Sequence, residues 1–325
     1  MDALSYWIMV AIGMVVTILG LILVAGYTVL FERRALALLQ DRYGPNRAGP
    51  FGIFQALCDA AKLLTKEYFL PGFVDKKLYA LAPILVVVSI LVSFALLPIG
   101  KNISWAGDFN IGLLFLMGLS SIHAYGVFLG GWASSSKYTM LGAIRTIAQL
   151  VSYELAMGVA LLGVVMLSGT FNLSEIVDKQ TIPYIVLQPV GFLVFLIAGI
   201  AETHRLPFDM PEAENELNAG FNTEYGGMPF AMFFLGEYLG VILVGAMTTT
   251  LYLGGWHGPW AETHPLMGVF WFVLKTFFLV FFFVWMRASV PRTRYDQLMA
   301  FGWKFLLPIG LVNILVTAIV GAFWM

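Results

Sequence analysis

The sequence of 325 residues has little charge, and this scarcity excludes most classes of protein. Asp, Glu, Lys and Arg together make up 11% of it, whereas 60% is hydrophobic. A water-soluble domain of this size could not cover its surface with so few polar side chains. The solvent for most of the chain must therefore be lipid. The formal net charge of −1 provides no global field that would attract nucleic acid, so no nucleic-acid partner is expected.

Cysteine and nucleotide motifs are also scarce. The single cysteine, Cys58, rules out a disulfide framework and cannot by itself hold an iron–sulfur cluster or a tetrahedral zinc ion. The chain has neither a Gly-x-Gly-x-x-Gly sequence nor a Walker-type loop. The histidines show no metal-ligand spacing, and they are His123, His204, His257 and His264. We expect no metal and no nucleotide site on this chain.

Long apolar runs are abundant. A membrane helix needs roughly 20 mainly apolar residues, and eight stretches reach about that length between charged positions. They predict an all-α integral membrane protein, a single domain over residues 1–325. The first run has no basic region before it, so we expect a membrane helix and not a removable signal. The predicted spans are Tyr6–Phe31, Leu78–Ile99, Phe109–Trp132, Arg145–Leu167, Pro183–Ala201, Pro229–Gly254, Pro265–Met286 and Phe305–Trp324.

Basic residues are gathered in alternate loops, which predicts the orientation because Lys and Arg are retained on the cytoplasmic side. The loop of residues 32–77 and the last loop hold twelve of them, whereas the opposite loops hold only Lys101 and Lys179. We expect both termini to be periplasmic in a bacterial cytoplasmic (inner) membrane. The twelve are Arg33, Arg34, Arg42, Arg47, Lys62, Lys66, Lys76, Lys77, Arg287, Arg292, Arg294 and Lys304.

The first of these loops is long enough to fold. Arg42-Tyr-Gly-Pro-Asn-Arg47 is a turn signal, because Gly-Pro and Asn together stop a helix. From Ile53 to Lys66 apolar residues repeat at helical spacing opposite polar ones, among them Asp59 and Lys62. This segment is too short and too charged to span, so it predicts an amphipathic helix in the membrane interface.

A second folded loop, residues 202–228, is acidic. Between Glu202 and Glu224 it sets six carboxylates against one cation, Arg205. One interpretation is a solvated loop in which Asp209 caps a short helix at Pro211. The other is a cluster with raised and coupled pKa values that suits proton uptake. Both remain open for the six, which are Glu202, Asp209, Glu212, Glu214, Glu216 and Glu224.

Three charged residues lie inside predicted spans: Glu154, Glu237 and Lys275. Each costs at least about 2.5 kcal/mol when ionised in the bilayer, so they should be paired, neutral or facing a wet cavity. The alternatives are a function in proton transfer and a structural ion pair between helices. Arg145 lies about 13 Å from Glu154 along one helix, with Gln149 and Ser152 between them, and cannot pair with it directly. This polar line could conduct protons or simply hydrogen-bond neighbouring helices.

Four segments carry a resemblance to a known family, and together with the spans they cover essentially the whole chain. They are Glu32-Arg-Arg-Ala-Leu-Ala-Leu-Leu-Gln-Asp-Arg-Tyr-Gly-Pro-Asn-Arg47, Arg145-Thr-Ile-Ala-Gln-Leu-Val-Ser-Tyr-Glu154, Pro207-Phe-Asp-Met-Pro-Glu-Ala-Glu214 and Pro291-Arg-Thr-Arg-Tyr-Asp-Gln-Leu298. In this order they resemble the H subunits of bacterial NADH:quinone oxidoreductase, respiratory complex I.

The resemblance implies a subunit that joins the peripheral electron-transfer arm to the membrane arm and forms much of the quinone chamber. It implies a portal between the first span, the interfacial helix and the sixth span. Candidate chamber or docking residues are Arg33, Arg34, Arg42, Arg47, Asp59, Lys62, Phe230 and Phe233; the four arginines equally suit lipid headgroups. Candidates for proton coupling are Glu154, Glu237, Arg145, Lys275 and the six carboxylates of the acidic loop.

The resemblance also implies the partners. FMN and iron–sulfur clusters are expected on other subunits, quinone is the expected substrate, and no cofactor is expected on this chain. The expected partners are peripheral quinone-site and iron–sulfur subunits, small membrane subunits, antiporter-like subunits and lipids. Two alternatives remain: an ion or solute transporter, which leaves the folded loops unexplained, and the membrane anchor of an energy-converting hydrogenase or ferredoxin-linked relative. The long Gly-Pro-Asn-Arg segment favours the quinone enzyme.

Overall fold

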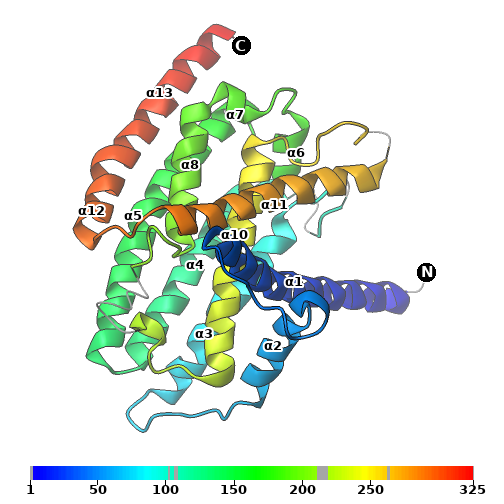
Figure 1. Cartoon of the computed structure of the whole chain (residues 1–325). Coiled ribbons are helices and arrows are strands. Elements are labelled where there is room, and N and C mark those ends of the chain that lie inside the picture. Colours follow the sequence, from blue (N-terminus) through cyan, green and yellow to red (C-terminus); the bar gives the residue numbers. More distant parts are fainter. Residues whose placement is uncertain (1–2, 102, 106–108, 211–218, 262–263, 325) are drawn as a thin grey trace.

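The computed structural model describes residues 3–101, 103–105, 109–210, 219–261 and 264–324, and in these ranges the regular elements are helices (Figure 1). Seven helical runs in this part of the chain are long and apolar enough to cross a membrane. They are α1 (Ala3–Leu39), α3 (Lys76–Leu96), α4 (Gly112–Ala133), α5 (Lys137–Ser168), α10 (Gly227–Tyr252), α11 (Pro265–Ser289) and a last run. The last run joins α12 (Tyr295–Phe301), the π-helical turn η3 (Gly302–Leu306) and α13 (Leu307–Trp324). An all-α membrane fold is thus confirmed.

The expected fifth span, Pro183–Ala201, is not a single helix. It consists of a four-residue helix, α7 (Tyr184–Leu187), and α8 (Pro189–Glu202), which is shorter than the other seven. Pro189 starts α8 at its first position, where a proline costs no hydrogen bond. Gln188 at the break donates from Nε2 to the carbonyl of Gly163 (3.0 Å) and to Oγ1 of Thr317 (2.9 Å), which ties it to α5 and α13.

Three other boundaries differ from expectation. Helix α1 continues past Phe31 to Leu39, so the charged residues expected at the start of a loop lie on a helix. Helix α5 begins at Lys137, before Arg145, and the last run begins at Tyr295, before Phe305. The cause is common to all three, because charged side chains mark the edge of the apolar region whereas the backbone hydrogen bonds of a helix continue through it.

Smaller helices occupy the loops. The expected interfacial helix is α2 (Gln55–Thr65), which follows the short turn η1 (Pro50–Gly52). The expected turn at 42–47 is confirmed as non-helical chain. Helix α6 (Leu173–Asp178) lies between α5 and α7, and the turn η2 (Gly220–Asn222) precedes α10. The short helix expected at Pro211 lies outside the described residues.

Small residues let the central helices approach closely. A Cβ atom added at Gly126 of α4 would lie 2.6 Å from Cγ2 of Val86, and one at Gly236 of α10 would lie 2.5 Å from its Cγ1. Val86 belongs to α3 and is buried. Helices α3, α4 and α10 therefore meet around one side chain, as is usual where membrane helices pack on small residues.

The N-terminal half of α1 leaves this bundle. In Figure 1 the helix projects from the other helices towards the N-terminus, and its apolar side chains, such as Trp7, Ile12 and Val16, are exposed. The other end of α1 packs on α2, α10 and α11. Because α2 also packs on α10, helices α1, α2 and α10 border a common space.

Candidate functional site

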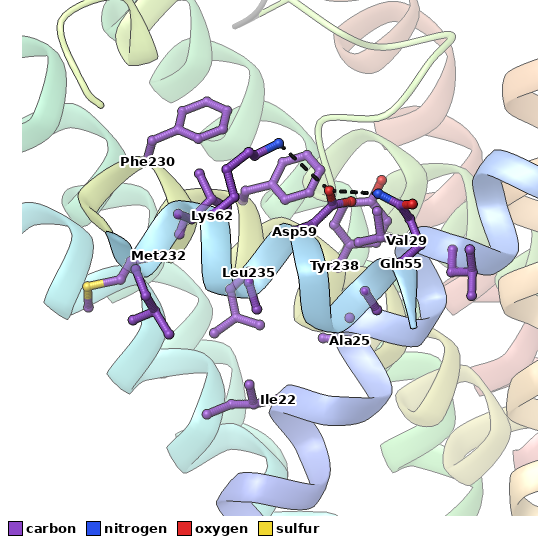
Figure 2. A pocket seen from close by; sticks show the side chains of 18 of the residues that line it. Ile22, Ala25, Val29, Gln55, Asp59, Lys62, Phe230, Met232, Leu235 and Tyr238 are labelled. Atoms are coloured by element: carbon purple, nitrogen blue, oxygen red, sulfur yellow. Dashed lines mark hydrogen bonds and ion pairs between the residues drawn. The ribbon is translucent and has the colours of Figure 1, made fainter. Parts of the chain in front are cut away.

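A cavity of about 470 Å³ lies between α1, α2 and α10. This volume falls in the range of pockets that hold small organic molecules. Figure 2 shows its apolar walls, with Ile22, Ala25 and Val29 from α1 facing Met232 and Leu235 from α10. Its polar lining residues are few, and they are Arg33, Gln55, Asp59, Lys62 and Tyr238.

The amphipathic pattern of α2 explains how these polar groups reach the cavity. Asp59 and Lys62 line the cavity together with Ala56 and Leu63, whereas Leu57 does not line it and exposes about half of its surface. A helix with one polar face against the protein and an exposed apolar face fits the membrane interface. The polar face closes one wall of the cavity.

An ionic cluster holds α2 to α1 at this wall. Nη1 of Arg33 donates to Oδ2 of Asp59 at 2.7 Å. Nζ of Lys62 lies 3.7 Å from Oδ1 of the same carboxylate (Figure 2). The amide of Gln55 donates to Asp59 as well, at 3.1 Å. Arg33 and Lys62 are largely solvent-accessible, so the pairs orient the groups more than they stabilise the fold.

A second large cavity, of about 530 Å³, lies between α1, α3, α10 and α11. Its lining in the described chain includes no charged side chain, and Tyr27, Thr28 and Thr276 are its polar members. A binding site needs a few convergent polar groups to orient its ligand. The α1–α2–α10 cavity is therefore the candidate site.

Tyr238 joins this cavity to a buried set of charges. Its ring lines the cavity, and the guanidinium of Arg205 lies over the ring, 4.1 Å from the centroid. Arg205 is 3.2 Å from Glu32 on α1 and 3.9 Å from Glu237 on α10. Arg287 of α11 also pairs with Glu32. All of these side chains except Arg287 are at least about nine-tenths buried, so the network is shielded from solvent.

Two further carboxylates lie beyond this network. Glu154 of α5 accepts hydrogen bonds from the hydroxyls of Ser120 (3.1 Å) and Ser121 (2.5 Å) on α4. Glu202, at the loop end of α8, is buried, and burial together with the charge of Glu154 raises its pKa to about 8. At neutral pH Glu202 thus holds a proton that most carboxylic acids have lost. Glu202 and Glu237 line the same small cavity.

Comparisons with known proteins assign the family. The profile of the family described as NADH dehydrogenase matches residues 12–318. An H subunit of NADH-quinone oxidoreductase from Geobacter metallireducens is 54% identical over 302 residues, which cover 90% of each chain. The H subunit of the same enzyme from Syntrophotalea carbinolica is 49% identical over 326 residues, 98% of this chain and 97% of that one.

The chain belongs to the NADH dehydrogenase family. The resemblance carried by the four motifs is thereby confirmed, and the hydrogenase alternative is not favoured.

Four of the eight chamber residues inferred from that family line the α1–α2–α10 cavity: Arg33, Asp59, Lys62 and Phe230. Phe233 does not. It is buried against Phe221 and Tyr225, with ring centroids 5.3 and 4.9 Å away, in the core between α3, α4 and α10. Phe233 thus lies outside the lining of this cavity, and its assignment to the quinone chamber stays a prediction.

The other three are arginines that lie away from the cavity lining. Arg34 is on α1, where Gly44 packs against it. Arg42 and Arg47 are exposed on the turn after α1. Arg42 donates to the side chain of Gln40 at 2.7 Å. Their positions favour the docking or lipid role that the family resemblance also allowed.

The polar residues of α5, from Arg145 to Glu154, make contacts of two kinds. Gln149 donates to the carbonyls of Ala201 and Phe208, both at 2.7 Å, and the hydroxyl of Ser152 donates to the carbonyl of Ala148. Arg145 lies over the ring of Tyr295, 5.8 Å from its centroid. Gln149 and Arg145 therefore tie α5 to α8, the acidic loop and α12, and proton conduction along this line stays a prediction. Glu154 alone joins the carboxylates.

Lys275 is far from these carboxylates. Its ammonium donates to the carbonyls of Leu253, Gly255 and His257 at 2.7 to 3.0 Å, where α10 ends. Leu253 is about 24 Å from Glu237 along α10. These contacts fix the loop between α10 and α11, and the grouping of Lys275 with the proton-coupling residues stays a prediction.

The acidic loop is described only in part. Its residues Glu212, Glu214 and Glu216 lie outside the described residues. Asp209 contributes its carbonyl oxygen to Arg292, and Glu224 contributes its carbonyl oxygen to the hydroxyl of Tyr79 at 2.9 Å. The loop is thus anchored to the last loop and to α3 through its backbone.

Sequence reasoning missed Glu32, Tyr238 and Arg287 as members of the site. A signal was present for Glu32, because it opens the first of the four motifs, and for Arg205, the one cation of the acidic loop. Tyr238 carried no such signal among the aromatic residues. Within the described ranges, no group of three or more His, Cys, Asp or Glu side chains is arranged to hold a metal ion.

Proposed function

We propose that this chain is the membrane subunit of a proton-translocating NADH–quinone oxidoreductase and that quinone binds in the cavity between α1, α2 and α10. Two relatives are named as H subunits of that enzyme. The observation that carries the proposal is the continuity from the cavity through Tyr238 and Arg205 to the buried Glu237 and Glu32. A quinone pairs an apolar tail with a polar head, and the cavity offers apolar walls with a few polar groups.

The redox chemistry belongs to other subunits. An iron–sulfur cluster on a partner subunit would supply the two electrons that, together with two protons, convert quinone to quinol. Negative charge that develops on the quinone acts through Tyr238 on the guanidinium of Arg205. Glu32, Glu237 and Glu202 respond to this charge by changing their protonation, because charges interact strongly where water is excluded. Antiporter-like subunits receive the resulting change.

The exposed basic turn serves assembly. We place Arg34, Arg42 and Arg47 at the surface that meets the peripheral quinone-site and iron–sulfur subunits and the lipid headgroups, on the predicted cytoplasmic side. In this orientation both termini are periplasmic. Small membrane subunits and lipid cover the apolar surface of α1.

The test of coupling is Glu154→Gln in the assembled enzyme. We expect proton translocation per quinone reduced to fall by about half or more, since a proton-transfer group contributes on the order of 10²–10⁴-fold to its step. Because the Glu154 charge raises the pKa of Glu202, its removal lowers that pKa from about 8. The alkaline limit of proton translocation should therefore move to lower pH. Quinone reduction and acidification are measured together in proteoliposomes between pH 6 and 9.

The matched control is Glu175→Gln, an exposed carboxylate of α6 far from the cavity. It should change neither the ratio nor the pH limit. A Glu154→Gln enzyme with the full ratio and an unmoved alkaline limit would exclude the carboxylates from coupling.

A further inference from the structure

Two histidines lie next to the buried carboxylates, and the proposed function gives neither of them a part. His123 projects from α4, and His204 follows α8 at the start of the acidic loop. Their rings are near parallel, 24° apart in plane, with centroids 6.5 Å apart. Two elements distant in sequence thus bring two titratable rings together.

A cavity of about 30 Å³ lies beside both histidines. Its lining includes both rings, together with Glu202 and Glu237, Ser93 from α3 and Ser120 from α4. A space of this size holds one or two water molecules, provided that two to four polar atoms face each. The lining supplies such atoms from four helices and one loop.

The polar atoms at this cavity have unused hydrogen-bonding capacity. Four atoms are buried and neither donate a hydrogen bond to a described residue nor accept one from it: Nδ1 of His123, both ring nitrogens of His204 and Oε2 of Glu202. A buried polar atom without a hydrogen-bond partner destabilises the folded protein. Four such atoms around one small cavity indicate bridging water, because it satisfies all of them at once.

The backbone at His204 adds an independent observation. His204 has φ of +54°, a left-handed conformation that is uncommon outside glycine, although histidine, asparagine and aspartate adopt it more often than other residues do. Strained residues of this kind cluster where a side chain must be held in one place for function. Burial, His123 and Arg205 lower the pKa of His204 to about 3, so its ring is neutral at rest.

We propose that His123 and His204, bridged by water in this cavity, form a proton-transfer station between Glu202 and Glu237. This inference rests on the proposed function and adds the residues that connect its two groups of carboxylates. A neutral imidazole has one N–H and one free lone pair, so it can accept a proton at one nitrogen and release another from the second.

The transfer balances without any further reactant. The O–H bond of the Glu202 carboxyl breaks as an N–H bond forms on a ring, directly or through the water. The N–H bond on the opposite nitrogen breaks, and its proton reaches the carboxylate of Glu237. Glu202 becomes a carboxylate, Glu237 a carboxylic acid, and the ring returns to its neutral form as the other tautomer. The resulting negative charge on Glu202 is relieved when this carboxylate takes up the next proton.

Several elements of the described chain surround His123 and His204, and each contributes side chains near the two rings. Helix α8 contributes Glu202, α10 contributes Glu237, α5 contributes Glu154 through Ser120, and the loop contributes Arg205. Helix α3 contributes Ser93 and Ile90, neither of which titrates near neutral pH. The histidines are therefore the groups that join the carboxylates.

The test compares His123→Phe with His123→Gln in the assembled enzyme. Phenylalanine keeps a ring in α4 without nitrogens, whereas glutamine keeps hydrogen-bonding atoms without a titratable group. We expect both variants to lower the proton-translocation rate by about tenfold or more, because neither can relay a proton. A structural role would be rescued by one of them. His264→Gln, at an exposed histidine far from the cavity, should match the parent enzyme.

A second measurement requires no variant to translocate protons. Infrared difference spectra of the enzyme with ¹⁵N-labelled histidine, recorded on quinone reduction, should show imidazole bands that shift with the label. His204→Asn, which tolerates the left-handed backbone, should remove those bands, and His264→Gln should keep them. Absence of histidine bands from the parent spectrum, or full translocation by His123→Phe, would overturn the proposal.

The failures of the two proposals are distinguishable. If Glu154→Gln lowers translocation and His123→Phe does not, the carboxylates couple without the histidines. If neither variant lowers it, the coupling function of the carboxylates fails as well.

Discussion

Gly26→Phe is expected to raise the apparent KM for quinone by about 10- to 100-fold, because its ring fills space that the quinone needs. Gly26 lines the α1–α2–α10 cavity, and a Cβ atom there would meet only the Cβ of Ala56, at 3.9 Å. The side chain therefore starts without a clash and extends into the cavity. Excess volume in a filled site costs about 1–3 kcal/mol, and each 1.4 kcal/mol is tenfold in affinity.

Gly20→Phe is the matched control on the same helix. Gly20 is exposed, and a Cβ atom there would have no described neighbour within 4 Å. The two positions lie about 9 Å apart along α1. Steady-state kinetics with a short-chain quinone should show a raised KM for Gly26→Phe and parental kinetics for Gly20→Phe. Equal KM values for the two variants would place the quinone elsewhere.

Arg205→Met is expected to cause the largest loss of assembled, active enzyme. The substitution removes the guanidinium that lies 3.9 Å from the carboxylate of Glu237. It also removes the cation stacked on the ring of Tyr238. Breaking a buried ion pair by removing one partner costs about 3–5 kcal/mol. We expect quinone reductase activity of membranes to fall to about a tenth or less of the parent.

Arg205→Lys separates charge from geometry. Lysine restores the positive charge but lacks the planar, bidentate guanidinium, so it should restore assembly more fully than turnover. The control is Arg294→Met, because Arg294 pairs with Asp296 on the surface, with both side chains about 70% exposed. Such a pair contributes about 0–1 kcal/mol. If Arg294→Met reduces activity as much as Arg205→Met, the buried network has no special importance. Immunoblots of the complex and quinone reductase assays check both outcomes.

The sequence could predict the membrane fold because apolar length alone decides it. Most spans were found, and the fifth was misjudged because Pro189, a favourable first residue of a helix, starts α8 after a break at Gln188. The ends of α1 and α5 were misplaced because charges at the end of an apolar run do not interrupt the backbone hydrogen bonds of a helix. The length and polarity of a segment thus predict where a helix leaves the apolar region, but they predict less well at which residue the helix ends.

The candidate site was predictable in its charged residues and not in its aromatic ones. The spacing of apolar residues predicts a short amphipathic helix and places Asp59 and Lys62 on its polar face. Phe230 and Phe233 begin the same helix with the same chemistry, and only the neighbouring α3 and α4 decide that one lines the cavity and the other fills a core.

The pairing of distant residues was beyond the sequence. His123 and His204 meet because α4 packs close to the loop after α8, and Arg205 meets Glu32 across 173 positions of sequence. Such contacts depend on helix packing, which local patterns do not contain. The sequence did indicate that the charged residues inside the predicted spans have partners, since a charge inside a membrane span must be paired, neutral or hydrated.

Photolabelling with a quinone that carries a reactive group on its head tests the location of the quinone site most directly. The assembled enzyme is labelled, digested and mapped by mass spectrometry, with excess unlabelled quinone as competitor. We predict competed labels on α1, α2 or α10, in the segments Ile22–Arg33, Gln55–Leu64 and Met228–Tyr238 that line the cavity. Gly26→Phe should reduce these labels, and Gly20→Phe should not. Competed labels confined to α12 and α13, or to other subunits alone, would contradict the site.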